Sequence, residues 1–253
     1  MVAVRLAWFI SSVCSAFRLF DLPYQDRIRY VARRSGVLPP LSYLCLPVSR
    51  TKSSARWLDR HFSDPYVRQA QARGLPSRAA FKLEEIQQRD RLLRPGMTVV
   101  DLGAAPGGWS RVAATLVGPK GRVVALDLLP MEATAGVEFI QGDFRESSIC
   151  ERLLTTLGER RVGLVLSDMA PNLSGIPTVD QPRTLYLAEL ADEFAQRVLD
   201  RDGSLLMKVF QGEGCDAFIK QLRSRFKTVA LRKPPASRPE SREVYVLAKG
   251  FIV

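Results

Sequence analysis

The sequence is poor in the residues that build disulfide frameworks, metal centres and membrane spans. It has four widely separated cysteines without a CxxC pair, and a single histidine, His61. A disulfide framework or a metal site is therefore not expected, and reduced thiols in a reducing compartment are the default. A serine–histidine–aspartate triad could be built only on His61. No apolar run approaches the roughly 20 residues that a membrane helix requires, so we expect no membrane partner.

Acidic residues are also scarce relative to basic ones. The 253 residues include 26 Asp and Glu against 37 Lys and Arg, a formal net charge of +11. Such a surplus indicates a polyanionic partner, although charge alone is weak evidence for one. The hydrophobic fraction of 46% is sufficient for a buried core.

The first 51 residues differ in composition from the rest of the chain. They contain seven arginines, two aspartates and no lysine, and no period of 2 or 3.6 runs through them. A signal peptide, an organellar transit peptide and a dispensable, poorly ordered extension are the three interpretations, of which we favour the extension. We place a domain boundary between residues 51 and 52. We expect a cytoplasmic monomer, or a mitochondrial protein if the segment is a transit peptide.

The next segment, Lys52 to Lys82, is basic and contains aromatic residues. The segment contains seven basic and two acidic residues, and the aromatic residues Trp57, Phe62, Tyr66 and Phe81 are interspersed among them. Such a segment is typical of an RNA-binding surface, although an ordinary solvated helix face has the same composition. Together with the basic loop over residues 232–242, it provides the candidate RNA contacts Lys52, Arg56, Arg60, Arg78 and Arg238.

Strand-length apolar runs alternate with helical patterns from about residue 77 onward. Strands are predicted at Met97–Leu102, Arg122–Asp127, Val137–Ile140, Val162–Ser167, Ser204–Phe210, Thr228–Arg232 and Val244–Ala248. Helices are predicted at Ser77–Arg89, Trp109–Val117, Ser147–Leu157, Arg183–Leu199 and Cys215–Arg225. Continuous apolar strands between helices indicate a doubly wound α/β fold, with ligands at the carboxyl ends of its strands. The two final strands follow each other directly and predict an antiparallel hairpin at one sheet edge.

A glycine-rich turn follows the first predicted strand and opens a helix, in the segment Val99 to Ser110. A dinucleotide fingerprint needs a glycine at position 105, where the chain has alanine. A phosphate-binding loop needs Lys-Ser/Thr after its last glycine, where the chain has Trp109-Ser110. A nucleoside ligand without a phosphate chain remains, and S-adenosylmethionine (AdoMet) fits that description.

Two acidic residues support an AdoMet site. Asp127 ends the second predicted strand, where a carboxylate can bind both ribose hydroxyls. Asp143 follows the third predicted strand and is placed to reach an adenine edge. Either residue taken singly could be a helix cap or a surface residue, so the interpretation depends on their order along the chain.

Four further polar residues are unusual for their surroundings: Lys82, Asp168, Lys208 and Glu243. Lys208 lies inside an apolar strand, where a lysine is costly unless it is paired or functional. The structural alternative is a core ion pair between Lys208 and Asp168.

These motifs resemble the FtsJ/RlmE family of ribose 2′-O-methyltransferases, and most closely its bacterial 23S rRNA members. The resemblance covers about residues 53–249. It rests on the segments 101–109, 127–131, 167–172, 208–214 and 241–245. The family's Lys-Asp-Lys-Glu tetrad matches Lys82, Asp168, Lys208 and Glu243, and its AdoMet contacts match Gly107, Trp109, Asp127, Asp143 and Asp168, to which we add Gly103 of the same turn. Only the first 51 residues depart from the bacterial pattern.

The resemblance implies a Rossmann-like AdoMet-dependent methyltransferase fold over residues 52–253. Its sheet would have seven mostly parallel strands with an antiparallel edge strand, and helices on both faces. The implied reaction is methylation of a uridine ribose 2′-hydroxyl in large-subunit rRNA, late in ribosome assembly and without a metal. Alternatives are a tRNA or mRNA-cap substrate, or a non-catalytic rRNA-binding assembly factor. Lys208 would act as a base or would only orient the hydroxyl.

Overall fold

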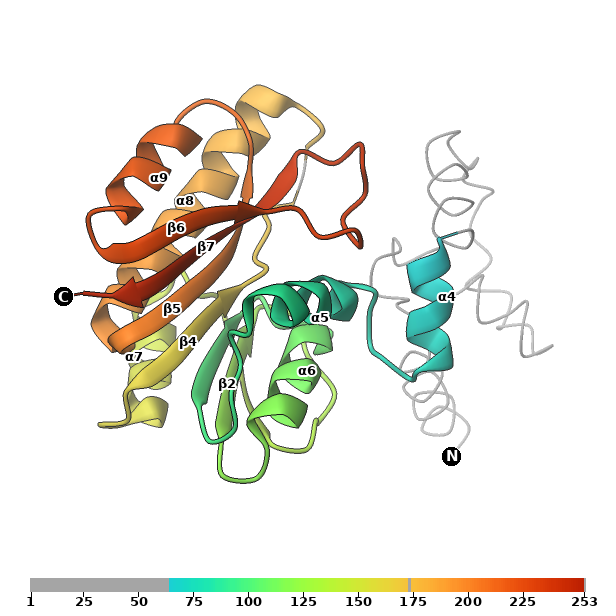
Figure 1. Cartoon of the computed structure of the whole chain (residues 1–253), viewed down its shortest axis with the longest axis vertical. Helices are drawn as coiled ribbons and strands as arrows, with labels where there is room; N and C mark the ends of the chain where they lie inside the picture. Colours follow the sequence, from blue (N-terminus) through green and yellow to red (C-terminus); the bar gives the residue numbers. More distant parts are fainter. Residues whose placement is uncertain (1–63, 173, 253) are drawn as a thin grey trace, which may run out of the picture. The chain divides into compact units, whose positions relative to one another are not determined.

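Seven strands form one mixed sheet within the part of the chain that the computed structural model describes, residues 64–172 and 174–252. Their order across the sheet is β3-β2-β1-β4-β5-β7-β6 (Figure 1). The strands are β1 Thr98–Leu102, β2 Arg122–Asp127, β3 Val137–Gln141, β4 Val162–Ser167, β5 Leu199–Phe210, β6 Phe226–Arg232 and β7 Glu243–Phe251. The proposed boundary after residue 51 and the residues Lys52, Arg56 and Arg60 lie outside the described residues.

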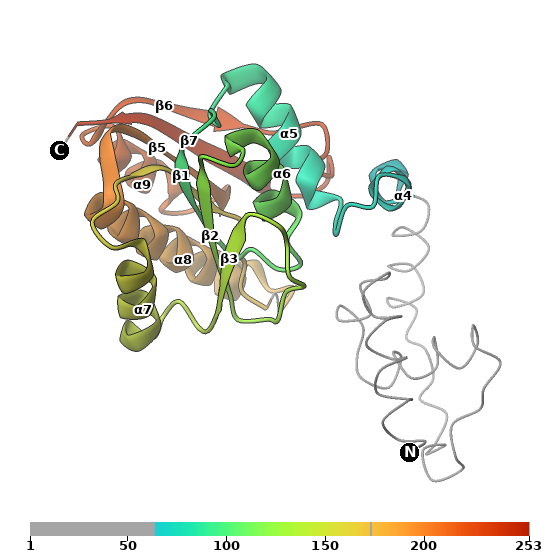
Figure 2. The same ribbon diagram turned by 90° about the horizontal axis from the view of Figure 1, so that it is seen from below.

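Helices cover both faces of this sheet. α5 (Ala79–Asp90) and α6 (Gly108–Val117) lie on one face. α7 (Ser147–Leu157), α8 (Pro177–Val198) and α9 (Cys215–Leu222) lie on the other face (Figure 2). None of the helices within the described ranges is long and apolar enough to span a bilayer. The arrangement is a Rossmann-like α/β fold with a mostly parallel sheet, which agrees with the alternation of strands and helices predicted from the sequence.

The alternation of side chains along the strands divides the core into two layers. Val99, Leu164 and Leu206 pack with buried residues of α5 and α6. Their strand neighbours Val100 and Val165 pack with buried residues of α7, α8 and α9. Because both faces are covered, both sets of side chains must be apolar, which explains the continuous apolar runs in the sequence.

The last strand, β7, is the antiparallel one and lies between β5 and β6. Because β5 and β6 are each antiparallel to β7, they run in the same direction. β6 therefore ends, and β7 begins, at the edge where β1 to β5 also end. The predicted hairpin is confirmed, and the loop 233–242 that joins its strands extends beyond that edge (Figure 1).

One helix, α4 (Pro65–Ala72), was not predicted from the sequence. Its Tyr66 ring lies 5.4 Å from the ring of Phe81 on α5. Glu85 of α5 accepts hydrogen bonds from the Tyr66 hydroxyl, at 3.0 Å, and from the backbone N–H of Ala236, at 2.8 Å. The carboxylate of Glu85 thus joins α4, α5 and the loop 233–242.

Candidate active site

The lysine in the apolar strand, Lys208 of β5, forms an ion pair with Asp168 at the end of β4. The Lys208 Nζ donates to the Asp168 Oδ1 at 3.0 Å and to the Asp168 backbone carbonyl at 2.6 Å. The side chain of Lys208 is only 9% exposed. Because both hydrogen bonds go to the same residue, they fix the orientation of the ammonium group as well as its distance from Asp168.

A second ion pair lies between Lys82 of α5 and Glu243 at the start of β7. The Lys82 Nζ lies 2.7 Å from the Glu243 Oε1, and both side chains are mostly buried. The four residues of the expected tetrad therefore form two lysine–carboxylate pairs. They come from α5 and from the carboxyl-edge ends of β4, β5 and β7.

A residue that the sequence analysis missed, Tyr245 of β7, joins the two pairs. Its hydroxyl accepts a hydrogen bond from the Lys82 Nζ at 3.0 Å and donates one to the Asp168 Oδ1 at 2.9 Å. Tyr245 has no exposed surface and lies directly opposite Lys208 in the β5–β7 pairing. Because residues two apart on a strand share a face, Glu243 was the signal that could have identified Tyr245.

The charges in this network determine its protonation. Burial acts to raise the pKa of Asp168, but the charges of Lys208 and Lys82 and the hydrogen bonds from Lys208 and Tyr245 outweigh it and lower that pKa below its ordinary value. Burial, together with the nearby carboxylates Asp168 and Glu243, raises the pKa of Tyr245 well above its ordinary value. Asp168 is therefore a carboxylate and Tyr245 a neutral hydroxyl donor at neutral pH.

The glycine turn lies beside this network, at the ends of β1 and β2. Gly103 has a φ of 76°, and a Cβ on it would come within 2.8 Å of the Met169 backbone nitrogen, next to Asp168. Gly107 precedes α6 with a φ of 100°. Only glycine adopts such conformations readily, so the turn and the Asp168 loop approach each other backbone to backbone.

Trp109 fixes this turn against α5 and Tyr245. Its indole Nε1 donates to the Ala79 carbonyl at 2.7 Å, and its ring lies 5.5 Å from the Tyr245 ring. Trp109 is 2% exposed. In this structure it is therefore a packing residue that connects the turn to the lysine pairs.

Asp127 holds both the glycine turn and the loop that follows β2. Its Oδ2 accepts from the Ala105 backbone N–H at 2.8 Å, and its Oδ1 accepts from the Leu129 N–H at 2.7 Å. Burial raises the pKa of Asp127, and these backbone bonds oppose the rise. Each oxygen keeps a second lone pair, so the carboxylate can also accept from a diol.

Asp101 is a third buried carboxyl group at this edge, and it was not among the predicted site residues. It is fully buried on β1, its Oδ2 accepts from the Ser110 hydroxyl at 2.6 Å, and its Oδ1 has no hydrogen-bond partner among the residues that the structure describes. Burial raises its pKa to about 7, and the charges of Asp168 and Asp127 add to the rise. The charges of Asp168 and Asp127 thus act on a third buried carboxyl group at the ends of β1, β2 and β4.

Asp143, the expected adenine contact, is paired with a nearby arginine. The Arg145 Nε donates to Asp143 Oδ1 at 3.0 Å and its Nη2 to Oδ2 at 2.5 Å. This pair lowers the pKa of Asp143 below its ordinary value. A ligand that binds the Asp143 carboxylate must therefore share it with Arg145 or displace it.

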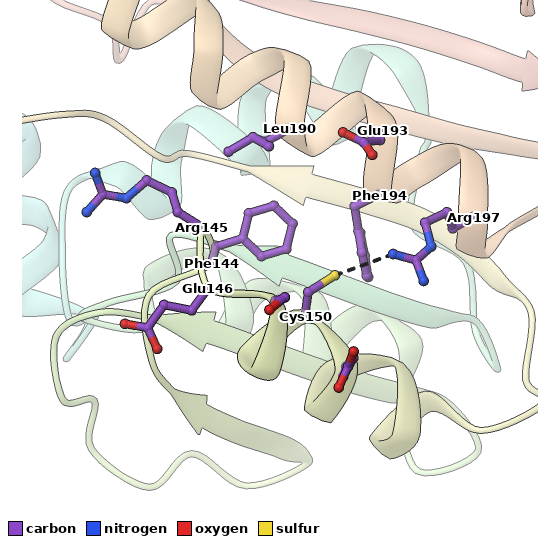
Figure 3. A pocket seen from close by; sticks show the side chains of 10 residues that line it. Phe144, Arg145, Glu146, Cys150, Leu190, Glu193, Phe194 and Arg197 are labelled. Carbon is purple, nitrogen blue, oxygen red and sulfur yellow. Dashed lines mark hydrogen bonds between the residues drawn. The ribbon is translucent and has the colours of Figure 1, made fainter.

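Arg145 also lines a pocket of about 220 Å³ between α7 and α8 (Figure 3). Cys150 lies in this pocket with its Sγ 3.9 Å from the Arg197 Nη1, and burial raises the pKa of its thiol. The pocket combines two arginines with three glutamates, so its charges largely compensate each other. In the described part of the chain, no three His, Cys, Asp or Glu side chains are grouped as metal ligands.

Of the expected RNA contacts, the structure describes Arg78 and Arg238. The Arg78 Nη2 donates to the Ala236 carbonyl, and its guanidinium lies over the Tyr66 ring at 5.7 Å. Arg78 therefore supports the loop 233–242. Arg238 lies within that loop, which also carries the exposed residues Lys233 and Arg242.

The chain is similar to one protein family and to two solved structures. The family model described as FtsJ-like methyltransferase matches residues 75–251, which include the glycine turn and both lysine pairs. A Plasmodium falciparum structure described as a ribosomal RNA methyltransferase is 24% identical, with a TM-score of 0.63, and the match covers 70% of this chain and 98% of that one. A Clostridium thermocellum structure described as an rRNA methylase is 15% identical, with a TM-score of 0.46, over 68% of this chain and 97% of that one.

Proposed function

Because this chain belongs to the FtsJ-like methyltransferase family, we propose that it transfers the methyl group of AdoMet to a ribose 2′-hydroxyl of RNA. One observation carries the proposal. Two lysine–carboxylate pairs, linked by Tyr245, lie at the sheet edge beside a glycine turn without a phosphate-binding lysine. Such a set of residues can orient a hydroxyl and assist the loss of its proton. Because the methyl donor is already activated, these are the main tasks left to the protein.

The residues at the turn fit AdoMet. The charges of Asp168 and Asp127 raise the pKa of the buried Asp101, so further negative charge is disfavoured at these strand ends and a cationic ligand is compatible with them. AdoMet supplies a methyl group on a positively charged sulfonium. Asp127 would hold the ribose and Asp143 the adenine edge, while Gly103, Gly107 and Trp109 form the turn beneath the amino-acid end.

The chain's own residues then act on the acceptor. Asp168 fixes the Lys208 ammonium group near the end of β5 through two hydrogen bonds. Lys82, fixed by Glu243 and Tyr245, adds positive charge that favours an alkoxide. As an ammonium group, Lys208 would orient the hydroxyl for in-line attack; to accept the hydroxyl proton, it would first have to release a proton of its own.

We propose large-subunit rRNA as the substrate, with a uridine ribose as the target and a late assembly stage as the time of reaction. The formal charge of +11 supports a polyanionic partner. The description of the Plasmodium falciparum relative as a ribosomal RNA methyltransferase agrees with this choice. We further propose that residues 52–253 form the catalytic domain and that the protein acts as a cytoplasmic monomer.

The test is methyl transfer from radiolabelled AdoMet to ribosomal particles, free rRNA, tRNA and capped mRNA, followed by mapping of the modified ribose. We expect label on a 2′-oxygen of large-subunit rRNA. Label on tRNA or cap would replace the substrate assignment, and tight rRNA binding without any transfer would support an assembly factor.

Lys208 variants distinguish its two roles in single-turnover assays. If Lys208 is the base, both Lys208→Ala and Lys208→Arg should reduce the rate to background, because arginine does not release its proton. If Lys208 only orients the hydroxyl, Lys208→Arg should retain a substantial rate.

A further inference from the structure

Tyr245 lies in an apolar environment in which a phenylalanine ring would pack equally well, so its hydroxyl group needs an explanation. The residue lies near the start of the mostly apolar strand β7, fully buried among the residues between the sheet and α5–α6. A buried hydroxyl costs free energy unless it is hydrogen-bonded. Both bonds of this hydroxyl go to members of the lysine–carboxylate network, so its only described hydrogen-bond partners are Lys82 and Asp168.

The direction of these two bonds is fixed by chemistry. An ammonium group can only donate, and a carboxylate can only accept. The Tyr245 proton therefore points to the Asp168 Oδ1 and its lone pair to the Lys82 Nζ. The raised pKa of Tyr245 keeps the proton on the hydroxyl over the working pH range, so the group takes no part in acid–base chemistry.

The rest of Tyr245 is held as firmly as its hydroxyl. Its backbone pairs with Lys208, its ring lies 5.5 Å from the Trp109 ring, and the Lys82 Nζ lies 5.5 Å from its ring centroid. The residue thus contacts the strand of one lysine, the side chain of the other and the cofactor turn. A hydroxyl on so rigid a ring fixes the spacing between its two partners.

We propose that Tyr245 is a positioning residue for methyl transfer, whose hydroxyl holds Lys82 and Asp168 in register with Lys208. This inference rests on the proposed function, because it assigns a role within that reaction. Without the hydroxyl, the Lys82–Glu243 pair and the Asp168–Lys208 pair lose their connection. Among the described residues, Lys208 is then the only partner that fixes the Asp168 carboxylate, and Glu243 the only one that fixes Lys82.

The test is Tyr245→Phe, which removes the hydroxyl and keeps the ring that packs on Trp109. We expect kcat for RNA methylation to fall about tenfold or more, as for loss of a hydrogen bond to a charged group. The KM for RNA and the Kd for AdoMet should stay within about twofold. The matched control is Tyr186→Phe, the same chemical change at a half-exposed position on α8, which should leave kcat unchanged.

The pH profile gives a second readout that a structural role would not move. Asp168 faces Lys208, Lys82 and Tyr245, and its charge raises the pKa of Asp101. Loss of the Tyr245 bond raises the pKa of Asp168, so the acid limb of kcat should shift to higher pH in Tyr245→Phe and not in Tyr186→Phe. Glu243→Gln combined with Tyr245→Phe should lower kcat by less than the product of the single effects, because both restrain Lys82.

Two results would overturn the proposal. The first is a Tyr245→Phe enzyme with wild-type kcat and an unchanged pH profile. The second is a fall in kcat that is matched by lost AdoMet binding and a lower Tm, which would make Tyr245 a packing residue only. If the wild-type chain methylates no ribose in any RNA, the proposed function itself fails, and the role of Tyr245 in it falls as well.

Discussion

Two buried aspartates at the same sheet edge differ in protonation because their neighbours differ. Asp168 faces two lysines, and its pKa is lowered although burial acts against the charged form. Asp101 has a serine hydroxyl as its bonded partner and carboxylates nearby, and its pKa rises to about 7. Burial alone therefore does not decide the charge of a carboxyl group; the partner within hydrogen-bond distance does.

The raised pKa of Asp101 predicts a pH dependence of stability. Its ordinary value is 3.8 and its folded value about 7, so between these pH values the folded state holds a proton that the unfolded state releases. The free energy of unfolding should therefore fall as the pH rises from about 4 to about 7, by on the order of 4 kcal/mol from this group. Asp101→Asn should remove that fall and gain stability relative to wild type at pH 8.

Denaturant unfolding of the AdoMet-free protein at pH 5 and pH 8 checks this prediction. Asp200→Asn, at an exposed aspartate, is the control and should not alter the difference between the two pH values. An Asp101→Asn protein that loses the same stability as wild type between pH 5 and pH 8 would contradict the assignment.

Among the helices and strands, those with a clear local pattern of apolar residues were predicted correctly from the sequence. The strands β2 and β4 have the predicted bounds, because an apolar run bounded by polar residues ends where burial ends. α4 was missed because it is short and has only two buried side chains, Val67 and Ala70. The start of α8 was placed at Arg183 because Pro182 breaks the helical pattern, whereas the helix begins at Pro177.

The candidate site was predictable only for residues that stand out in their own segment. A lysine in an apolar strand is visible, whereas a tyrosine in such a strand is ordinary. Tyr245 belongs to the site because its hydroxyl bonds to Lys82 and Asp168, which are 163 and 77 positions away in the chain. Such pairings depend on how α5 and β4 meet β7, which no local pattern contains.

The first turns of α8 brace the two loops that follow the catalytic strands. Asp180 accepts hydrogen bonds from the Ser174 backbone N–H at 2.8 Å and from the Gly175 N–H at 2.9 Å. Gln181, the next residue, donates from Nε2 to the Glu213 carbonyl at 2.8 Å. One helix end therefore sets the positions of the loop after β4 and the loop after β5.

Asp180→Ala should loosen the loop after β4 and raise the KM for RNA by roughly three- to tenfold, as for lost hydrogen bonds of ordinary strength. The Kd for AdoMet should change less than this KM, because Asp180 holds Ser174 and Gly175, whereas the glycine turn meets the loop at Met169. Glu189→Ala, at an exposed position on the same helix, is the control. Steady-state kinetics with varied RNA measure the effect, and a weaker AdoMet affinity with unchanged KM for RNA would contradict it.

At the scale of the whole molecule, the direction of the strands determines which charged residues lie at the same end of the sheet. The ends of β1, β2, β4 and β5, the end of β6 and the start of β7 lie at one edge of the sheet. The lysine pairs, the glycine turn and the basic loop 233–242 therefore lie at the same edge. The segment 160–161, with Arg160 and Arg161, precedes β4 and lies at the opposite edge.

This polarity predicts that position, and not the net charge of +11, governs RNA binding. Arg242→Glu and Arg161→Glu make the same change in charge at exposed arginines on opposite edges. Arg242→Glu should weaken RNA binding and reduce the salt dependence of the affinity by about one phosphate contact, with AdoMet binding intact. Arg161→Glu should change neither. RNA affinities measured at several salt concentrations decide the matter, because equal weakening by both variants would mean that the RNA responds only to total charge.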